Sequence, residues 1–233
     1  MPIEHKHHVS STLPVVAALA AAAGFVDAFV FQHVTPVFVA NMSGNLVRLG
    51  MSAGVHDGHQ AVAALVALAG FAAGVTAGAV HLDTHVRSER PPNPSGLLFV
   101  EASLLTALAL MLQTTDIGFS ASTKAGDYPV VLIGAAAMGM QAIALRRVGK
   151  VAISTTYGTG AVVRLSEKFA LAFRKTPRPE NHRRRTSIAI LGTVLLSYIF
   201  GAFVAASWSS NPYLLFIPAG VSVICAAVES RNY

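Results

Sequence analysis

Six apolar runs, separated by polar breaks containing proline or glycine, follow one another along the chain. At a rise of 1.5 Å per residue, about 20 helical residues cross the ~30 Å hydrocarbon core of a bilayer. The pattern therefore predicts an all-α polytopic membrane protein with a single transmembrane domain over residues 1–233. Its six transmembrane helices are expected at residues 13–34, 60–81, 96–113, 129–145, 187–207 and 211–228.

Composition and charge agree with this assignment. Hydrophobic residues make up 53% of the chain and charged residues 12%, whereas soluble domains carry roughly 25% charged residues. The first run exceeds the roughly 7–15-residue core of a signal peptide and contains Asp27, so we interpret it as a retained span. The basic residues, which give a formal net charge of +6, fall between the apolar runs. They indicate membrane topology, and no nucleic-acid partner is expected.

The basic residues also predict the orientation of the protein. If the N-terminus is cytoplasmic, only Arg48 and Lys124 fall outside, and the other fifteen of the 17 Lys and Arg residues fall inside. Such a bias is typical of cytoplasmic loops. Both termini are therefore expected in the cytoplasm, together with a basic loop at residues 173–186.

The two halves of the chain, residues 13–113 and 129–228, resemble each other. Residues 43–49, SGNLVRL, match residues 159–165, TGAVVRL, at four of seven positions, and residues 24–27 occupy nearly the place of residues 139–142. Each half has three spans, an odd number, so the second half must enter the membrane from the opposite side. The sequence therefore predicts an inverted repeat, a plan common among transporters.

A short extra helix is expected after the first span of each half. Pro36 should end the first helix, yet the chain stays apolar as far as Asn41, where N-cap residues begin. The second half repeats this arrangement near residues 158–160. We interpret both segments as re-entrant loops with a half-helix, since non-helical backbone is tolerated at membrane depth only inside protein or beside a wet cavity. The alternative is that both short helices lie on the membrane surface.

Two re-entrant half-helices from opposite sides would bring their N-termini together near the midplane. A helix N-terminus offers free N–H groups and about half a positive charge, which suits a small polar or anionic solute. The candidate substrate-binding residues are Asp27, Asn41, Ser43, Gly44, Asn45, Gln141, Thr155, Thr156, Thr159 and Gly160, and the candidate pore-flanking residues are Arg48 and Arg164.

Several of these residues allow a second interpretation. Asp27 is either a titrating or cation-binding group, or a structural partner for backbone N–H groups at residues 41–45 or for Arg48. Gln141 either lines the cavity or bonds a neighbouring helix. Arg48 and Arg164 are either pore charges or anchors that extend to the membrane surface.

Two further features belong to helix packing. Gly70, Gly74 and Gly78 form a smooth face on the second span. Packing within the chain is the favoured interpretation of this face, and a homo-oligomer contact is the alternative. Glu101, near one end of the third span, is expected to extend to the surface or to pair with an arginine that follows the second span.

A family resemblance follows from these motifs. Residues 24–28, GFVDA, and 38–46, FVANMSGNL, resemble the signature of the YoaK-like bacterial membrane proteins, and residues 155–160, TTYGTG, resemble that family's threonine-rich second motif. The resemblance covers nearly the whole chain. It implies a multi-pass protein of the bacterial cytoplasmic (inner) membrane with about six spans, and it implies no activity.

The leading functional expectation is a transporter or channel for a small polar solute. One alternative is a non-transporting assembly or regulatory subunit, and another is a membrane-embedded enzyme acting on a lipid. An enzyme would need a nucleophile or a metal site, and the sequence shows neither arrangement. We therefore expect no enzymatic activity, no cofactor and no metal, with the lipid bilayer and the solute as partners.

Overall fold

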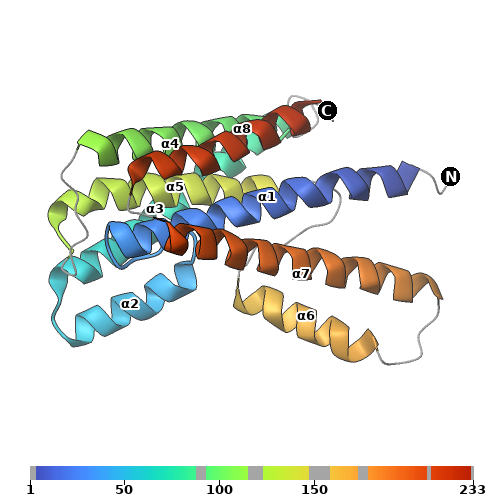
Figure 1. The fold of residues 1–233 in the computed structure, drawn as a ribbon, viewed down its shortest axis with the longest axis horizontal. Helices are drawn as coiled ribbons and strands as arrows, with labels where there is room; N and C mark the ends of the chain where they lie inside the picture. The colour runs from blue at the N-terminus through green and yellow to red at the C-terminus, as the bar shows by residue number, and fades with distance from the viewer. Residues whose placement is uncertain are drawn as a thin grey trace.

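The computed structural model describes residues 4–87, 93–114, 123–146, 158–172, 178–208 and 211–231, and every regular element in these ranges is a helix (Figure 1). Six helices are long and apolar enough to cross a membrane, which confirms the predicted number of spans. They are α1 (Glu4–His33), α3 (Gly58–Arg87), α4 (Ser95–Thr114), α5 (Tyr128–Leu145), α7 (Arg178–Ser207) and α8 (Phe216–Ser230). The shorter helices are α2 (Met42–Gly54), α6 (Thr159–Ala172) and the 3-10 turns η1 (Ala125–Asp127) and η2 (Pro212–Leu215).

The long helices run along one axis, and the start of α1 and the end of α8 lie at the same end of the molecule (Figure 1). At this end three helices extend beyond the predicted spans: α1 begins at Glu4, α3 continues to Arg87, and α7 begins at Arg178. The apolar pattern identifies only the part of each helix that lipid can cover. Polar turns continue the same backbone hydrogen bonding past that part.

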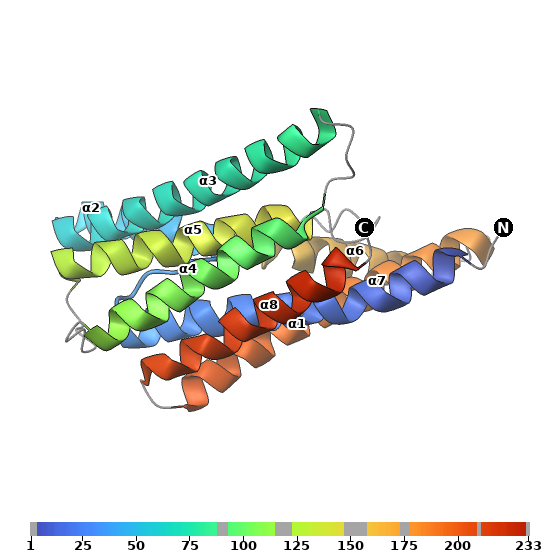
Figure 2. The same ribbon diagram turned by 90° about the horizontal axis from the view of Figure 1, so that it is seen from above.

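The spanning helices pack in pairs, α1 with α7, α3 with α5, and α4 with α8 (Figure 2). Glycines bring the α1–α7 pair into close contact. A Cβ atom added at Gly24 would overlap the backbone oxygen of Tyr198, and one added at Gly201 would overlap that of Ala21. Each glycine thus faces the carbonyl group three residues before its partner glycine.

The α3–α5 pair repeats this geometry. A Cβ atom at Gly74 would overlap the oxygen of Ala136, and one at Gly139 would overlap the oxygen of Phe71. Exchanging α1 with α5, α3 with α7 and α4 with α8 leaves the set of helix pairs unchanged, and exchanged helices run in opposite directions (Figures 1 and 2). An inverted repeat would produce this arrangement, and the repeat itself stays a prediction.

The glycine face of α3 is covered by α5. Gly70 faces the oxygen of Leu132, Gly74 that of Ala136, and Gly78 the side chain of Ile143. The favoured interpretation, packing within the chain, is confirmed. The three glycines face α5 in this structure, and formation of a homo-oligomer stays a prediction.

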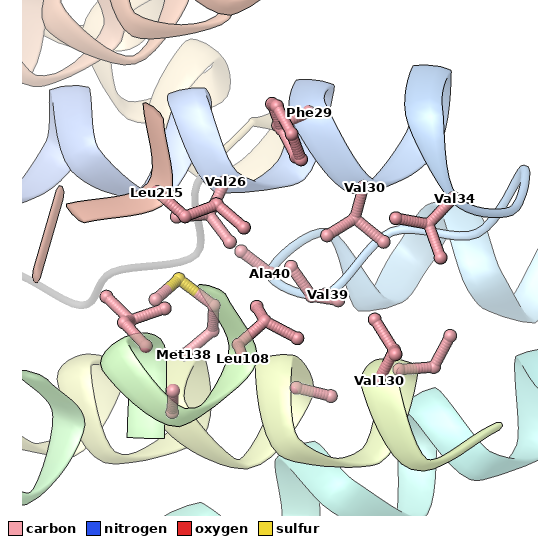
Figure 3. Close-up of a cluster of buried hydrophobic side chains, with 14 of the residues drawn as sticks. Val26, Phe29, Val30, Val34, Val39, Ala40, Leu108, Val130, Met138 and Leu215 are labelled. Atoms are coloured by element: carbon pink, nitrogen blue, oxygen red, sulfur yellow. The ribbon is translucent and has the colours of Figure 1, made fainter. Parts of the chain in front are cut away.

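The main hydrophobic core includes the chain between α1 and α2. Val37 and Val39 in this connection are fully buried. Figure 3 shows Val39 and Ala40 lying between the apolar face of α1 and side chains of α4 and α5, among them Leu108 and Val130. The connection is therefore part of the interior of the bundle.

The two short helices lie alongside spanning helices, α2 against α3 and α6 against α7. Their first residues face the middle of the molecule, and they run towards opposite ends of it (Figures 1 and 2). Neither lies across an end of the bundle. This placement favours the re-entrant interpretation over the surface interpretation.

Candidate functional site

Residues 34–41 reverse the chain direction inside the bundle without forming a helix. Pro36 has no N–H group and ends the helical hydrogen bonding of α1. The Thr35 N–H donates to Val30 O at 3.1 Å, and the Val37 N–H donates to Thr35 O at 2.7 Å. Because lipid offers no hydrogen-bond partner, the remaining N–H groups of this segment need partners from side chains.

Asp27 supplies two of those partners. Its Oδ1 accepts the backbone N–H groups of Val39 and Ala40, each at 2.6 Å, and its Oδ2 accepts the hydroxyl of Tyr198 from α7. The side chain is 2% exposed. The sequence allowed Asp27 to be either a titrating group or a structural partner for backbone N–H groups, and the structure favours the structural role. The N–H groups that it bonds belong to Val39 and Ala40, just before the predicted residues 41–45.

Asn45 and Asn41 hold the other end of the segment. Asn45 Oδ1 accepts the N–H of Phe38 at 2.9 Å, and its Nδ2 donates to the oxygen of the same residue at 2.6 Å, as a neighbouring β-strand would. Asn41 is the N-cap of α2, as predicted, and its Oδ1 accepts from Gly44 N at 3.3 Å and Ser43 Oγ at 2.8 Å. A side chain at Gly44 would overlap the Phe38 ring.

A second polar cluster joins this segment to the starts of α3 and η1. Gln60 Nε2 donates to Pro36 O at 3.0 Å, and Gln60 Oε1 accepts from the Thr123 hydroxyl at 2.8 Å. The hydroxyl oxygens of Thr35 and Thr123 lie 2.9 Å apart. All three polar side chains are buried. Hydrogen bonds from Asp27, from Asn45 and from this cluster therefore fix the segment together.

The structure adds Tyr198, Gln60 and Thr123 to the residues predicted from the sequence. Each is polar within or beside an apolar run, which is the only signal that the sequence offers. The structure also corrects the prediction for Glu101, which does not extend to the surface. Its side chain is fully buried and lies 2.9 Å from Ser222 Oγ on α8.

The two predicted pore-flanking arginines lie in different surroundings. The Arg48 guanidinium lies over the Phe31 ring, 5.2 Å from its centroid, and that ring stacks on Phe38. Arg164 is exposed on α6. The aromatic contact of Arg48 favours the anchor interpretation for that residue, and a pore role for either arginine stays a prediction.

In the second half, Thr155 and Thr156 lie outside the described residues. Thr159 is exposed and Gly160 half-buried at the start of α6. Gln141 donates from Nε2 to Leu19 O on α1 at 3.1 Å. This bond is the helix-to-helix role that the sequence allowed as the alternative to lining a cavity.

A cleft of about 500 Å³ lies between α6 and α7. Its lining is predominantly apolar, with Leu165, Phe169 and Ile188 among its residues. Such a surface suits lipid chains and offers a polar solute few partners. The polar groups at the starts of α2 and α6, namely Asn41, Ser43, Thr159 and Gly160, stay the predicted site for a polar solute.

The fold defines a polytopic helical membrane protein with six spanning helices and two short helices packed alongside them. The chain matches the family described as "Protein of unknown function (DUF1275)" over residues 15–228 and belongs to that family. It is similar to the UPF0700 transmembrane protein YoaK of Bacillus subtilis (strain 168), with 28% identity over 211 residues that make up 88% of each chain. These matches confirm the resemblance drawn from the motifs. No solved structure matches the chain.

Replacing Asn45 with aspartate tests its role in holding the segment. Asn45→Asp keeps an acceptor for the Phe38 N–H but removes the donor to the Phe38 oxygen, so we expect a loss of about 1–3 kcal/mol of stability. Thermal unfolding in detergent measures the change. Asn41→Asp is the matched control, because the cap uses only an acceptor oxygen, and its stability should stay close to wild type. Equal losses in the two variants would contradict this assignment.

Proposed function

We propose that the protein is a transporter or channel for a small polar or anionic solute, with its site between the starts of α2 and α6. One observation carries the proposal: two short helices alongside the bundle begin towards the middle of the molecule and run towards opposite ends (Figure 1). Half-helices that point their N-termini at a midplane site recur in transporters with inverted repeats.

The chemistry of the two helix starts determines the class of solute. The first turns of a helix carry N–H groups without helical partners and a partial positive charge, so both favour negative charge or a hydrogen-bond acceptor. Asn41 and Ser43 contribute side-chain groups on the α2 side, and Thr159 contributes a hydroxyl on the α6 side. Small anions and small polar molecules fit this set.

The proposal gives Asp27 and Asn45 a supporting role. Their polar atoms bond the backbone of residues 38–40 and thereby fix the position of Asn41 and the start of α2. A solute in the site would meet residues that this scaffold positions, and it would not need a contact with Asp27. The Asp27 side chain therefore affects the site only by holding the neighbouring backbone in place.

The proposed orientation places both termini in the cytoplasm and the bundle in the bacterial cytoplasmic membrane. The start of α1, the end of α3, the start of α7 and the end of α8 share one end of the molecule (Figures 1 and 2). The sequence near these helix ends carries most of the Lys and Arg residues. The positive-inside rule supports a cytoplasmic position for this end.

Swelling of proteoliposomes in formate, nitrate or urea tests the function. We expect at least one of these solutes to enter faster than into protein-free liposomes. Ser43→Phe or Thr159→Phe, each at the inner start of its half-helix, should reduce that entry at least several-fold by filling the space between the starts. Gly54→Phe is the control, because it lies at the other end of α2, where an added Cβ meets open space.

Two outcomes contradict the proposal. Equal entry rates in Ser43→Phe, Thr159→Phe and Gly54→Phe would move the path away from the two helix starts. Entry no faster than in protein-free liposomes for any of the three solutes would favour the non-transporting assembly subunit. All variants need the same thermal stability in detergent as wild type before their rates are compared.

A further inference from the structure

A buried carboxyl group in the α4–α8 interface lies outside the site described above. Glu101 is fully buried, and its Oε2 is enclosed without a hydrogen-bond partner among the described residues. Its other oxygen, Oε1, lies 2.9 Å from Ser222 Oγ. A carboxylate ion in a membrane interior is costly unless hydrogen bonds or a cation compensate for the loss of water.

The hydrogen bonds of Ser222 bear on whether Glu101 carries a proton. The Ser222 hydroxyl lies 2.9 Å from Glu101 Oε1 and 3.1 Å from Pro218 O, but it has one hydrogen to donate. If Glu101 is ionised, two acceptors compete for that hydrogen. If Glu101 is protonated at Oε1, its O–H donates to Ser222 Oγ, and the serine donates to Pro218 O. Only the protonated carboxyl satisfies both contacts at once.

Among the described residues no basic side chain bonds the Glu101 carboxyl group, because Oε2 has no partner and His81, the basic residue beside α4, lies against Gly96 at the helix start. Cys225 and Glu229 follow Ser222 at spacings of three and seven residues on α8, and both are buried. The neighbouring α5 carries no charged residue, and neither does η2.

We propose that Glu101 is a proton-binding site of the membrane interior and is protonated in this conformation at neutral pH. Asp27 differs from Glu101 in the number of hydrogen-bond donors around it, because Asp27 accepts two backbone N–H groups and the Tyr198 hydroxyl. These three donors offset part of the cost of burying a charge on Asp27, whereas Glu101 meets only the Ser222 hydroxyl. A role for this proton in driving solute movement rests on the proposed function, whereas the protonation of Glu101 does not.

Glu101 also occupies a distinctive place in the fold. It is six residues from the start of α4, and Ser222 is six residues from the start of α8. The exchange of α4 with α8 that the predicted inverted repeat requires would therefore exchange these two residues. Movement of α4 against α8, which transport under the proposed function would require, would break the bond between Glu101 and Ser222 and release the proton.

Infrared spectroscopy of the full-length protein in liposomes tests the proposal. At about pH 8, where exposed carboxyl groups are ionised, wild type should keep a carbonyl band of a protonated carboxyl group that shifts in D₂O. Glu101→Gln should abolish this band. Glu229→Gln is the matched control, because it removes another buried carboxyl group of α8 and should leave the band in place.

A second variant keeps the test decisive if Glu101→Gln does not fold. Ser222→Ala removes the hydrogen-bond acceptor, so the band should move to higher frequency without loss of intensity. The proposal is overturned if wild type lacks the band at about pH 8, if the band persists in Glu101→Gln, or if Ser222→Ala leaves its frequency unchanged. None of these outcomes depends on solute flux, so failure of the transport proposal would be seen separately in the swelling assay.

Discussion

Asp27→Leu is expected to abolish the folded bundle. Leucine leaves the N–H groups of Val39 and Ala40 and the hydroxyl of Tyr198 without their acceptor in a dry interior. Each unpaired buried group costs about 1–3 kcal/mol, so the three together approach the whole stability of a typical domain, about 5–15 kcal/mol. The measurement is recovery of monodisperse protein from the membrane, followed by thermal unfolding in detergent.

Asp27→Asn is the matched variant that separates structure from titration. The amide oxygen still accepts both backbone N–H groups, and the amide nitrogen donates to the Tyr198 oxygen, which accepts as well as donates. We expect Asp27→Asn to fold with a loss of about 1–2 kcal/mol, since bonds to a charged acceptor are stronger than neutral ones. Tyr198→Phe removes a single bond to the carboxylate and should cost a similar amount.

The flux of Asp27→Asn distinguishes the two interpretations of this carboxylate. A coupling or cation-binding group would lose its function on neutralisation even in a stable protein. A structural acceptor would keep it, so we expect swelling rates in Asp27→Asn within about twofold of wild type. A stable Asp27→Asn protein without flux would contradict the structural role, and a fully stable Asp27→Leu protein would contradict it more directly.

The number of spans and the position of the half-helix after α1 could be predicted because strong local signals determine them. Apolar length identifies a span, Pro36 ends α1, and the cap at Asn41 begins α2. Each signal lies within a few residues of the feature that it predicts. The extra turns of α1, α3 and α7 carry no apolar signal, so the sequence pattern placed these helix ends too close to the membrane.

The roles of the polar residues could be predicted only as alternatives. Asp27 reaches Tyr198 across 171 positions of sequence, and Gln141 reaches Leu19 across 122. Periodicity and spacing contain no information about such distant partners. A buried Asp with three donors and a buried Glu with one look alike as isolated acidic residues in apolar runs. Their difference comes entirely from the helices packed against them.

The close helix contacts at glycines could be predicted from the sequence only in part. Residues 24–27 and 139–142 occupy matching places in the two halves, and Gly24 and Gly139 each lie at a close helix crossing. Their partners Gly201 and Gly74 could not be identified, because nothing local says which helix each one faces. The matching glycines therefore predict that a helix makes a close contact at that position, but they do not predict which helix it contacts.

Gly201→Ala and Gly74→Ala are expected to destabilise the protein by about 3 kcal/mol each, at the upper end of the usual cost of overpacking. The added methyl group would overlap a backbone oxygen, that of Ala21 in one crossing and that of Ala136 in the other. A backbone atom in the middle of a helix cannot move aside alone, so the whole helix pair must separate. Thermal unfolding in detergent measures the loss.

Gly192→Ala is the control on the same helix as Gly201. An added Cβ there meets no atom within 4 Å, and alanine is favoured over glycine in a helix by about 1 kcal/mol. Its stability should equal or exceed that of wild type, so the two alanine substitutions on α7 should act in opposite directions. If the two crossings are equivalent parts of an inverted repeat, Gly201→Ala and Gly74→Ala should cost similar amounts. A large loss at one crossing with none at the other would contradict that equivalence, while opposite signs at Gly201 and Gly192 would still establish the tight α1–α7 contact.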